Sequence, residues 1–504
     1  ITYDYFNIFL LYKYTICIFI TMDGDSQTQT DVNPSASAQV TVSGGIPDFI
    51  RLDQIPVNYI QQVETDLLEP VVNNDPTLGD GFCRFQLQRK GFLHSHSKLF
   101  LSLVPAGTNA EAMPPVNVGI GSVIKKAVLK VGNQVINEIG DWQHLHAVKS
   151  SLIANELNKE REQYLTGRSL CHKFKYDKTG DLAGRQADGI ILDNGVEEGG
   201  RLTANNTSPV DALVMDGTSA VTIAESPSYA VDLSDLFPFL KVHQLPLYMI
   251  EQPVTIELTW APQISSRAVV SSDGNGGLAY ALDPNETKFM ADYIFYGSGD
   301  EMEQYRQANQ DMTFSFVDYR LNAATLPDMS GAGGTTIIRN LGMANRMVTR
   351  VVTVFSQQAT ATGQLAGAFS SKAPVRAGDG SVGVFKYNVR YNDRFEFASD
   401  VENTARLFSL LTDAESVPFV TREEYSNAGA LFVAGSTMMG RSQTILGGEF
   451  FYNSTRLTGG RVGHRGIELH ITGQMPATAI TLRSYCEYLR VARLRNGKFE
   501  LFNA

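Results

Sequence analysis

Short segments in which apolar and polar residues alternate recur along the whole chain. In Ser97–Val104, Leu99, Leu101 and Leu103 fall on one face of an extended strand, and in Pro253–Trp260 every second residue is apolar. An apolar period of two is typical of strands with one buried face. The same pattern predicts further strands at Ala127–Val131, Phe289–Tyr296, Met312–Leu321, Met347–Phe355, Val384–Tyr391, Gly466–Thr472 and Tyr485–Leu494.

Helical periodicity is confined to a few connecting segments. Trp142–Leu157 repeats apolar residues at mostly three- and four-residue spacing, and Asp141 before it is a plausible N-cap. Met302–Asn309 and Ala398–Leu411 are shorter helical candidates. Many short strands with few helices favour antiparallel β-sandwiches over a parallel α/β sheet. The pattern therefore predicts an all-β fold.

Three pairs of similar segments occur in the same order in the two halves of the chain. They are Gly119–Val131 with Gly342–Val354, Ile256–Leu258 with Ile467–Leu469, and Ala291–Tyr293 with Cys486–Tyr488. The separation within the pairs shrinks along the chain, which indicates longer loops in the first half, among them Lys178–Glu225. Ordered internal similarity indicates a duplicated structural unit. We expect two sandwiches with a boundary near residue 300.

Length and composition agree with two soluble globular domains. A chain of 504 residues exceeds the roughly 250–300 residues at which single cores stop growing. The net charge of −11 argues against coating nucleic acid, which requires a basic surface. The four cysteines, at positions 17, 83, 171 and 486, form no CxxC pair, so we expect no structural disulfide or zinc.

The first 45 residues differ in composition from the rest of the chain. Residues 1–21 are rich in Ile, Phe and Tyr, and two interpretations remain open: translated sequence upstream of a start at Met22, or a membrane-touching segment. The apolar run from Phe6 to Ile20 contains Lys13 and is shorter than the roughly 20 apolar residues of a spanning helix. Residues 22–45 are polar and predict a flexible arm.

Five segments together resemble the double jelly-roll major capsid proteins of eukaryotic double-stranded DNA viruses. The candidate groups are polinton-like viruses, virophages and the nucleocytoplasmic large DNA viruses. The resemblance covers about residues 46–504. Its motifs are Gly121–Glu138, Trp142–Leu157, Asp232–Trp260, Ala291–Asp300 continuing into the acidic Glu301, and Tyr485–Gly497.

The resemblance implies two consecutive eight-stranded antiparallel jelly-roll sandwiches, at 46–300 and 301–504. It implies a homotrimer whose six sandwiches form a pseudo-hexameric capsomer of an icosahedral shell around a double-stranded DNA genome. Implied partners are neighbouring capsomers, penton and minor capsid proteins, and an internal membrane. We expect no sequence-specific nucleic-acid binding, and we expect location in the virion after assembly in host cytoplasm or nucleus. No cofactor and no catalytic or metal-binding residue is implied.

Residues that could carry chemistry have simpler explanations. Two HxH pairs, His94/His96 and His144/His146, have no neighbouring Cys or carboxylate that would complete a metal site. The acidic pairs Glu197-Glu198 and Glu423-Glu424 could imitate a glycosidase pair, but adjacent acids in loops are usually solvated. No GxSxG elbow is present. We therefore expect a protein that is not an enzyme.

Two surface features remain as candidates. N-x-S/T sequons at Asn205, Asn206, Asn285 and Asn453 are possible glycosylation sites. The arginines at positions 483, 490, 493 and 495 lie on and after a predicted strand. They could contact nucleic acid beneath a shell, but we expect them to form ion pairs between subunits.

Two alternative functions stay open. One is a minor capsid or penton protein of the same lineage. The other is a carbohydrate-binding or glycosidase-like sandwich, which would need polar groups converging in a concave pocket.

Overall fold

The computed structural model describes the greater part of the two predicted domains. The described residues are 62–74, 81–105, 112–114, 118–153, 165–167, 174–176, 190–192, 200–201, 228–262, 268–271, 280–326, 335–357, 386–401, 406, 453–456, 461–473 and 480–503. The predicted arm 22–45, the segment 1–21 and most of the loop Lys178–Glu225 lie outside them.

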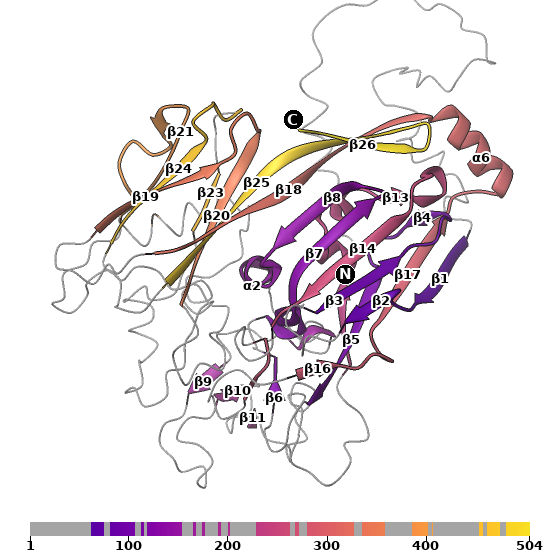
Figure 1. Cartoon of the computed structure of the whole chain (residues 1–504), viewed down its shortest axis with the longest axis horizontal. Coiled ribbons are helices and arrows are strands. Elements are labelled where there is room, and N and C mark those ends of the chain that lie inside the picture. Colours follow the sequence, from indigo (N-terminus) through magenta and orange to yellow (C-terminus); the bar gives the residue numbers. More distant parts are fainter. Residues whose placement is uncertain are drawn as a thin grey trace, which may run out of the picture. The chain divides into compact units, whose positions relative to one another are not determined.

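The first sandwich consists of two antiparallel sheets (Figure 1). The larger sheet contains β1 (Gln62–Leu68), β4 (Phe92–Leu93), β5 (Lys98–Pro105), β12 (Ser228–Asp232), β13 (Leu245–Pro246), β16 (Tyr280–Leu282) and β17 (Lys288–Phe295). The second sheet contains β2 (Val72–Asn74), β3 (Phe82–Gln86), β7 (Ile124–Val131), β8 (Gln134–Gly140) and β14 (Val254–Trp260).

The second sandwich is also built from two antiparallel sheets. One sheet contains β18 (Asp311–Thr325), β20 (Val348–Gln357), β23 (Asn453–Arg456), β25 (Ile480–Arg495) and β26 (Lys498–Asn503). The other contains β19 (Thr335–Gly342), β21 (Lys386–Tyr391), β22 (Arg394–Phe395) and β24 (Ile467–Gly473). β18 and β25 pair without interruption from Asp311 opposite Arg495 to Thr325 opposite Thr481.

Smaller elements connect these strands. Two small sheets comprise β9 (Phe174–Tyr176), β10 (Ile190–Leu192) and β11 (Gly200–Arg201), and β6 (Ala112–Met113) with β15 (Val270–Ser271). The helices are α2 (Trp142–Ile153), α4 (Leu233–Leu236), α5 (Pro238–Val242) and α6 (Gly299–Ala308), with single 3₁₀ turns η4 (Gly119–Val123) and η7 (Leu247–Met249). Among the described residues, no helix is long and apolar enough to cross a membrane.

Both sandwiches have the same strand order. The order β1-β17-β5-β12 in one sheet and β3-β14-β7-β8 in the other recurs as β18-β25-β20-β23 and β19-β24-β21-β22. Each set of eight strands has the jelly-roll arrangement, in which most neighbouring strands are distant in sequence, while β7-β8 and β21-β22 are consecutive hairpins. The predicted fold class, two consecutive eight-stranded antiparallel jelly rolls, is confirmed.

The strand order tests the three predicted repeat matches. Two of them join equivalent strands: Ile256 with Ile467, on β14 and β24, and Tyr293 with Tyr488, on β17 and β25. The match of Gly119–Val131 with Gly342–Val354 is wrong, because it aligns β7 with β20, whereas the equivalent of β7 is β21. Alternating aliphatic strands resemble one another whatever their place in the sheet, so this match carried no positional information.

The alternating apolar positions form the core as predicted. Leu99, Leu101 and Leu103 are buried, as are Val254, Ile256, Leu258 and Trp260. A single cluster of buried apolar side chains includes residues of both sandwiches. Strands before α6 pair only with one another in the described part of the chain, and so do strands after it. The domain boundary near residue 300 stays a prediction.

Two of the three helices expected from periodicity are present, and most of the third, Ala398–Leu411, lies outside the described residues. α2 begins at Trp142 as predicted, and its described part ends at Ile153. α6 begins three residues earlier than predicted, because Ser298 and Glu301 form a capping box at its first turn. Asp141 lies at a left-handed φ of 44°, and its carboxylate binds Arg483 (Arg483 Nε–Asp141 Oδ2, 2.7 Å).

The turn before β24 gives a test of the second sandwich. A Cβ on Gly466, at φ 77°, would lie 2.3 Å from the carbonyl oxygen of Gly342. A Cβ on Gly342, at φ 74°, would meet nothing within 4 Å. We expect Gly342→Ala to lower the free energy of unfolding by about 1–2 kcal/mol through its left-handed backbone alone. Gly466→Ala adds a backbone clash and should cost clearly more in urea unfolding; equal losses would contradict this packing.

Candidate functional site

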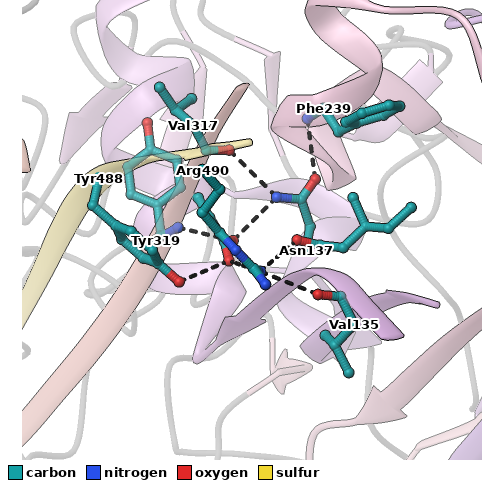
Figure 2. Close-up of polar contacts among 9 residues, drawn as sticks. Val135, Asn137, Phe239, Val317, Tyr319, Tyr488 and Arg490 are labelled. Carbon is teal, nitrogen blue, oxygen red and sulfur yellow. Dashed lines mark hydrogen bonds and ion pairs between the residues drawn. The ribbon is translucent and has the colours of Figure 1, made fainter. Parts of the chain in front are cut away.

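The most extensive polar contact between the two sandwiches surrounds the side chain of Asn137 on β8. This side chain is fully buried, yet each of its polar atoms is hydrogen-bonded. Nδ2 donates to Asp318 Oδ1 at 3.1 Å and to the carbonyl of Val317 at 3.3 Å, while Oδ1 accepts from the backbone N–H of Phe239 at 3.0 Å (Figure 2). One amide therefore joins β8, α5 and β18.

Asp318 and Arg490 complete this polar junction, which we define as Asn137, Asp318, Tyr488 and Arg490. Asp318 Oδ2 accepts from Arg490 Nη1 at 2.9 Å and from the Tyr488 hydroxyl at 3.1 Å. Arg490 Nη1 also donates to the carbonyls of Val135 and Ile136, at 3.1 and 2.7 Å (Figure 2). A guanidinium on β25 thus bonds to a carboxylate of its own sandwich and to the backbone of the other.

The electrostatics of the junction follow from its burial. Asp318 is only 2 % exposed, and burial raises the pKa of its carboxyl group. The charge of Arg490 and hydrogen bonds from Asn137, Arg490 and the Tyr319 N–H act in the opposite direction on this pKa. Both carboxylate oxygens face donors, so the ionised form has a partner at each position.

An aromatic cluster packs beside the polar junction. Phe239 of α5 contacts Phe314 and Phe316 of β18, with ring centroids 5.7 and 5.0 Å apart, and Phe499 of β26 at 6.4 Å. His243 Nε2 lies 2.7 Å from the carbonyl of Ser315. Buried aromatic pairs add packing energy beyond that of their buried area, so this cluster strengthens the contact between the sandwiches beside the polar junction.

Two further contacts fix the ends of the interface. Arg483 forms an ion pair with Asp141, and the buried Tyr485 hydroxyl donates to the Asp141 carbonyl at 2.7 Å. At the other end the N–H of Glu251 donates to the carbonyl of Gly497 at 2.9 Å. Gly497 lies at φ 75°, and a Cβ there would be 2.5 Å from Glu251 Cγ. The sandwiches are thus held at three places along β18, β25 and the β25–β26 turn.

The expected role of the arginine cluster needs correction. Arg483, Arg490 and Arg493 form ion pairs within the chain, with Asp141, Asp318 and Asp311 respectively. Arg495 is exposed at the end of β25. The strand pattern placed these residues correctly on β25, but it could not reveal that acidic residues distant in sequence lie opposite them.

The histidine pairs have local partners in the structure. The rings of His94 and His96 lie 5.1 Å apart in the turn before β5, and His94 Nδ1 accepts from the His96 N–H. On α2, His144 is buried, and this burial lowers its pKa well below the usual value, while His146 stacks on Trp142. No group of three or more His, Cys, Asp or Glu side chains in the described ranges could hold a metal ion.

The sequons are only partly within the described residues. Asn285 is exposed in a turn that begins at Asp283, and Thr287 of the same sequon is fully buried, its hydroxyl donating to the Asp283 carbonyl at 2.7 Å. Asn453 begins β23, and Asn205 and Asn206 lie outside the described residues. All four stay predictions.

The described cysteines form no disulfide, and the two acidic pairs are not among the described residues. Cys83 and Cys486 are buried free thiols, and burial raises the pKa of each to about 12. Glu197-Glu198 and Glu423-Glu424 lie outside the described residues.

A groove of about 530 Å³ between the end of β3 and the segment before β14 is lined by Arg89 and by a single carboxylate, that of Glu251. Its lining therefore lacks the paired carboxylates of a glycosidase.

The charge in the polar junction can be tested with Asp318→Asn. The substitution keeps the shape of the side chain and leaves the guanidinium of Arg490, whose side chain is 14 % exposed, without its counter-ion. Removing one partner of a buried pair costs about 3–5 kcal/mol, and we expect a loss of this order in the free energy of unfolding by urea. Asp311→Asn is the matched control, because Asp311 pairs with Arg493 at the exposed end of the same strands and should change stability little. Equal effects of the two substitutions would contradict the proposed role of Asp318.

Comparisons with known proteins agree with this architecture. No protein-family model matches the sequence, and no curated protein sequence matches it. VP54 of PBCV-1, in a structure fitted into a cryo-EM reconstruction of the virophage Sputnik, is similar over 88 % of this chain and 98 % of its own, with a TM-score of 0.50 and 12 % identity. A chain of the quasi-atomic model of the PBCV-1 virus capsid is similar over the same shares, with a TM-score of 0.51 and 13 % identity. The chain therefore has the double jelly-roll fold that is found in these viral capsid structures.

Proposed function

We propose that this chain is a viral major capsid protein and not an enzyme. The observation that carries the proposal is the pair of jelly rolls joined by a buried interface, in a fold similar to that of the PBCV-1 capsid structures. The resemblance of its sequence motifs to double jelly-roll major capsid proteins supports the same function. The proposed shell is icosahedral and encloses a double-stranded DNA genome.

The duplicated fold suits a trimer that behaves as a hexagon. Three copies related by closed cyclic symmetry present six similar sandwiches, so one kind of unit can fill a hexagonal lattice. Such a trimer requires the two sandwiches of a chain to keep a fixed relation, and the polar junction with its aromatic cluster provides this. Contacts between trimers can each be weak, because many of them act together in a shell.

Partners and location follow from the same proposal. The trimer would contact neighbouring capsomers, penton and minor capsid proteins, and an internal membrane. Its place is the capsid shell of the virion, after assembly in the host cytoplasm or nucleus. The net charge of −11 agrees with a shell protein that does not bind the genome sequence-specifically.

The mass of the purified chain in solution separates this function from its alternatives. We expect a trimer at micromolar concentration, since obligate interfaces of more than roughly 2,000 Å² remain associated under dilution. Multi-angle light scattering measures this mass directly. A pentamer would favour a penton protein, and a monomer that binds sugars would favour a carbohydrate-binding sandwich; either result would overturn the proposal.

We further propose that the polar arm 22–45 reaches a neighbouring subunit or the inner face of the shell, and that Lys178–Glu225 belongs to the outer projection of the capsomer. The support for both lies in the sequence, which is polar and poor in periodicity there. Deletion of residues 22–45 should leave the trimer mass unchanged while the yield of closed particles in an assembly reaction falls strongly. Normal particle yield, measured by electron microscopy, would refute the role of the arm.

A further inference from the structure

The interface between the two sandwiches of one chain has a counterpart that no described strand of the same chain pairs with. The intrachain interface places β8 of the first sandwich against β18 and β25 of the second. By strand order, the equivalent of β8 in the second sandwich is β22, and the equivalent of β18 in the first sandwich is β1. The edge at β22 and the face of β1 therefore occupy the positions that would form a second interface of the same kind.

Strand registers identify the residues that correspond on the β8 side. In the first sandwich Ile256 pairs with Leu129, and Leu129 pairs with Asn137. In the second, Ile467, the equivalent of Ile256, pairs with Tyr391, which pairs with Arg394. Arg394 thus occupies the position of Asn137.

The same procedure identifies the residue that corresponds to Asp318. Asp318 pairs with Tyr488 across β18 and β25. Tyr293 is the equivalent of Tyr488, and it pairs with Glu64 on β1. The hydrogen bond from Asn137 to Asp318 therefore maps onto a pair formed by Arg394 and Glu64, whose charges are opposite.

Burial distinguishes the two interfaces. Asn137 and Asp318 are 0 % and 2 % exposed, whereas Arg394 is exposed and the side chain of Glu64 is 38 % exposed. Phe395 on β22, at 48 % exposed, and Val63 and Leu67 on β1, at 54 % and 56 %, lie on the opposite faces of their strands from Arg394 and Glu64. Opposite charges at equivalent positions of two open strands are typical of surfaces that meet in a complex.

We propose that β22 of one copy docks on β1 of the next copy, with Arg394 opposite Glu64. The proposal rests on the proposed trimer and names the surfaces that build it. Repeating the contact three times closes a ring in which intrachain and interchain interfaces alternate, as cyclic symmetry requires. Within the free chain the Glu64 carboxylate accepts from Lys90 Nζ at 2.9 Å and from Gln62 Nε2 at 3.1 Å. Arg394 Nη2 donates to the Tyr391 hydroxyl at 3.4 Å. These bonds orient both charged groups before association.

Charge reversal with rescue tests this pairing. Glu64→Arg and Arg394→Glu each place like charges at the interface, and we expect each to raise the trimer dissociation constant on the order of tenfold or more, measured by light scattering on dilution. The double variant Glu64→Arg/Arg394→Glu should recover most of the lost affinity. A control reverses an exposed charge away from the mapped positions, Glu500→Arg on β26, and should leave association unchanged.

A disulfide test detects the same contact by proximity instead of by charge. In a chain with Cys17 and Cys171 replaced by Ser, Glu64→Cys/Arg394→Cys should give linked dimers and trimers on oxidation, while each single cysteine variant should not. A wild-type trimer with neither charge rescue nor cross-links would overturn this inference and leave the proposed function standing. A wild-type chain that stays monomeric would overturn both.

Discussion

The carboxylate of Asp318 lies almost entirely out of water, and a buried charge is tolerated only where donors surround it. Its donors are the side chains of Asn137, Tyr488 and Arg490 and the N–H of Tyr319. Asn137 comes from the first sandwich, and Arg490 binds both Asp318 and the backbone of the first sandwich. A slip of either sandwich would leave a buried charge without its partner, so the polar junction fixes their relation more strictly than apolar packing alone.

The interface within the chain and the proposed interface between copies differ in how long each is exposed to water. The intrachain contact forms during folding and is never open to water afterwards, so a neutral amide can meet the carboxylate there. The proposed contact between copies must wait in solvent until another chain arrives. Charged residues such as Arg394 and Glu64 are well hydrated in that state, which keeps an exposed edge soluble and guides association. The strands β8 and β22 occupy equivalent edges of the two sandwiches. The difference in their exposure to water explains why Asn137 is a neutral amide and Arg394 is charged.

The sequence predicted the fold class and most strands, because alternating burial leaves a period of two in the chain. It also located α6, whose acidic first turn and serine cap act locally. The repeat was detected correctly at Ile256 and Tyr293, where a distinctive acidic residue lies between apolar ones, and wrongly at Gly119–Val131, where the pattern was only aliphatic. The polar junction itself was not foreseen. Asn137 and Asp318 are 181 positions apart, and a buried polar residue in a strand has no local signature.

The uninterrupted pairing of β18 with β25 has a consequence for the order of events during synthesis. Asp318 and Tyr488 meet across 170 positions of sequence, and Arg490 reaches Ile136 across 354. Closing such long loops is slow compared with local pairing, and β25 leaves the ribosome after β18 and after the whole first sandwich. Until β25 emerges, β18 lacks its neighbour, and Phe499, which packs on Phe239 of the first sandwich, has not yet been made. The nascent chain therefore holds both sandwiches unfinished, and only a full-length product acquires the rigid geometry that a ring of copies can accept.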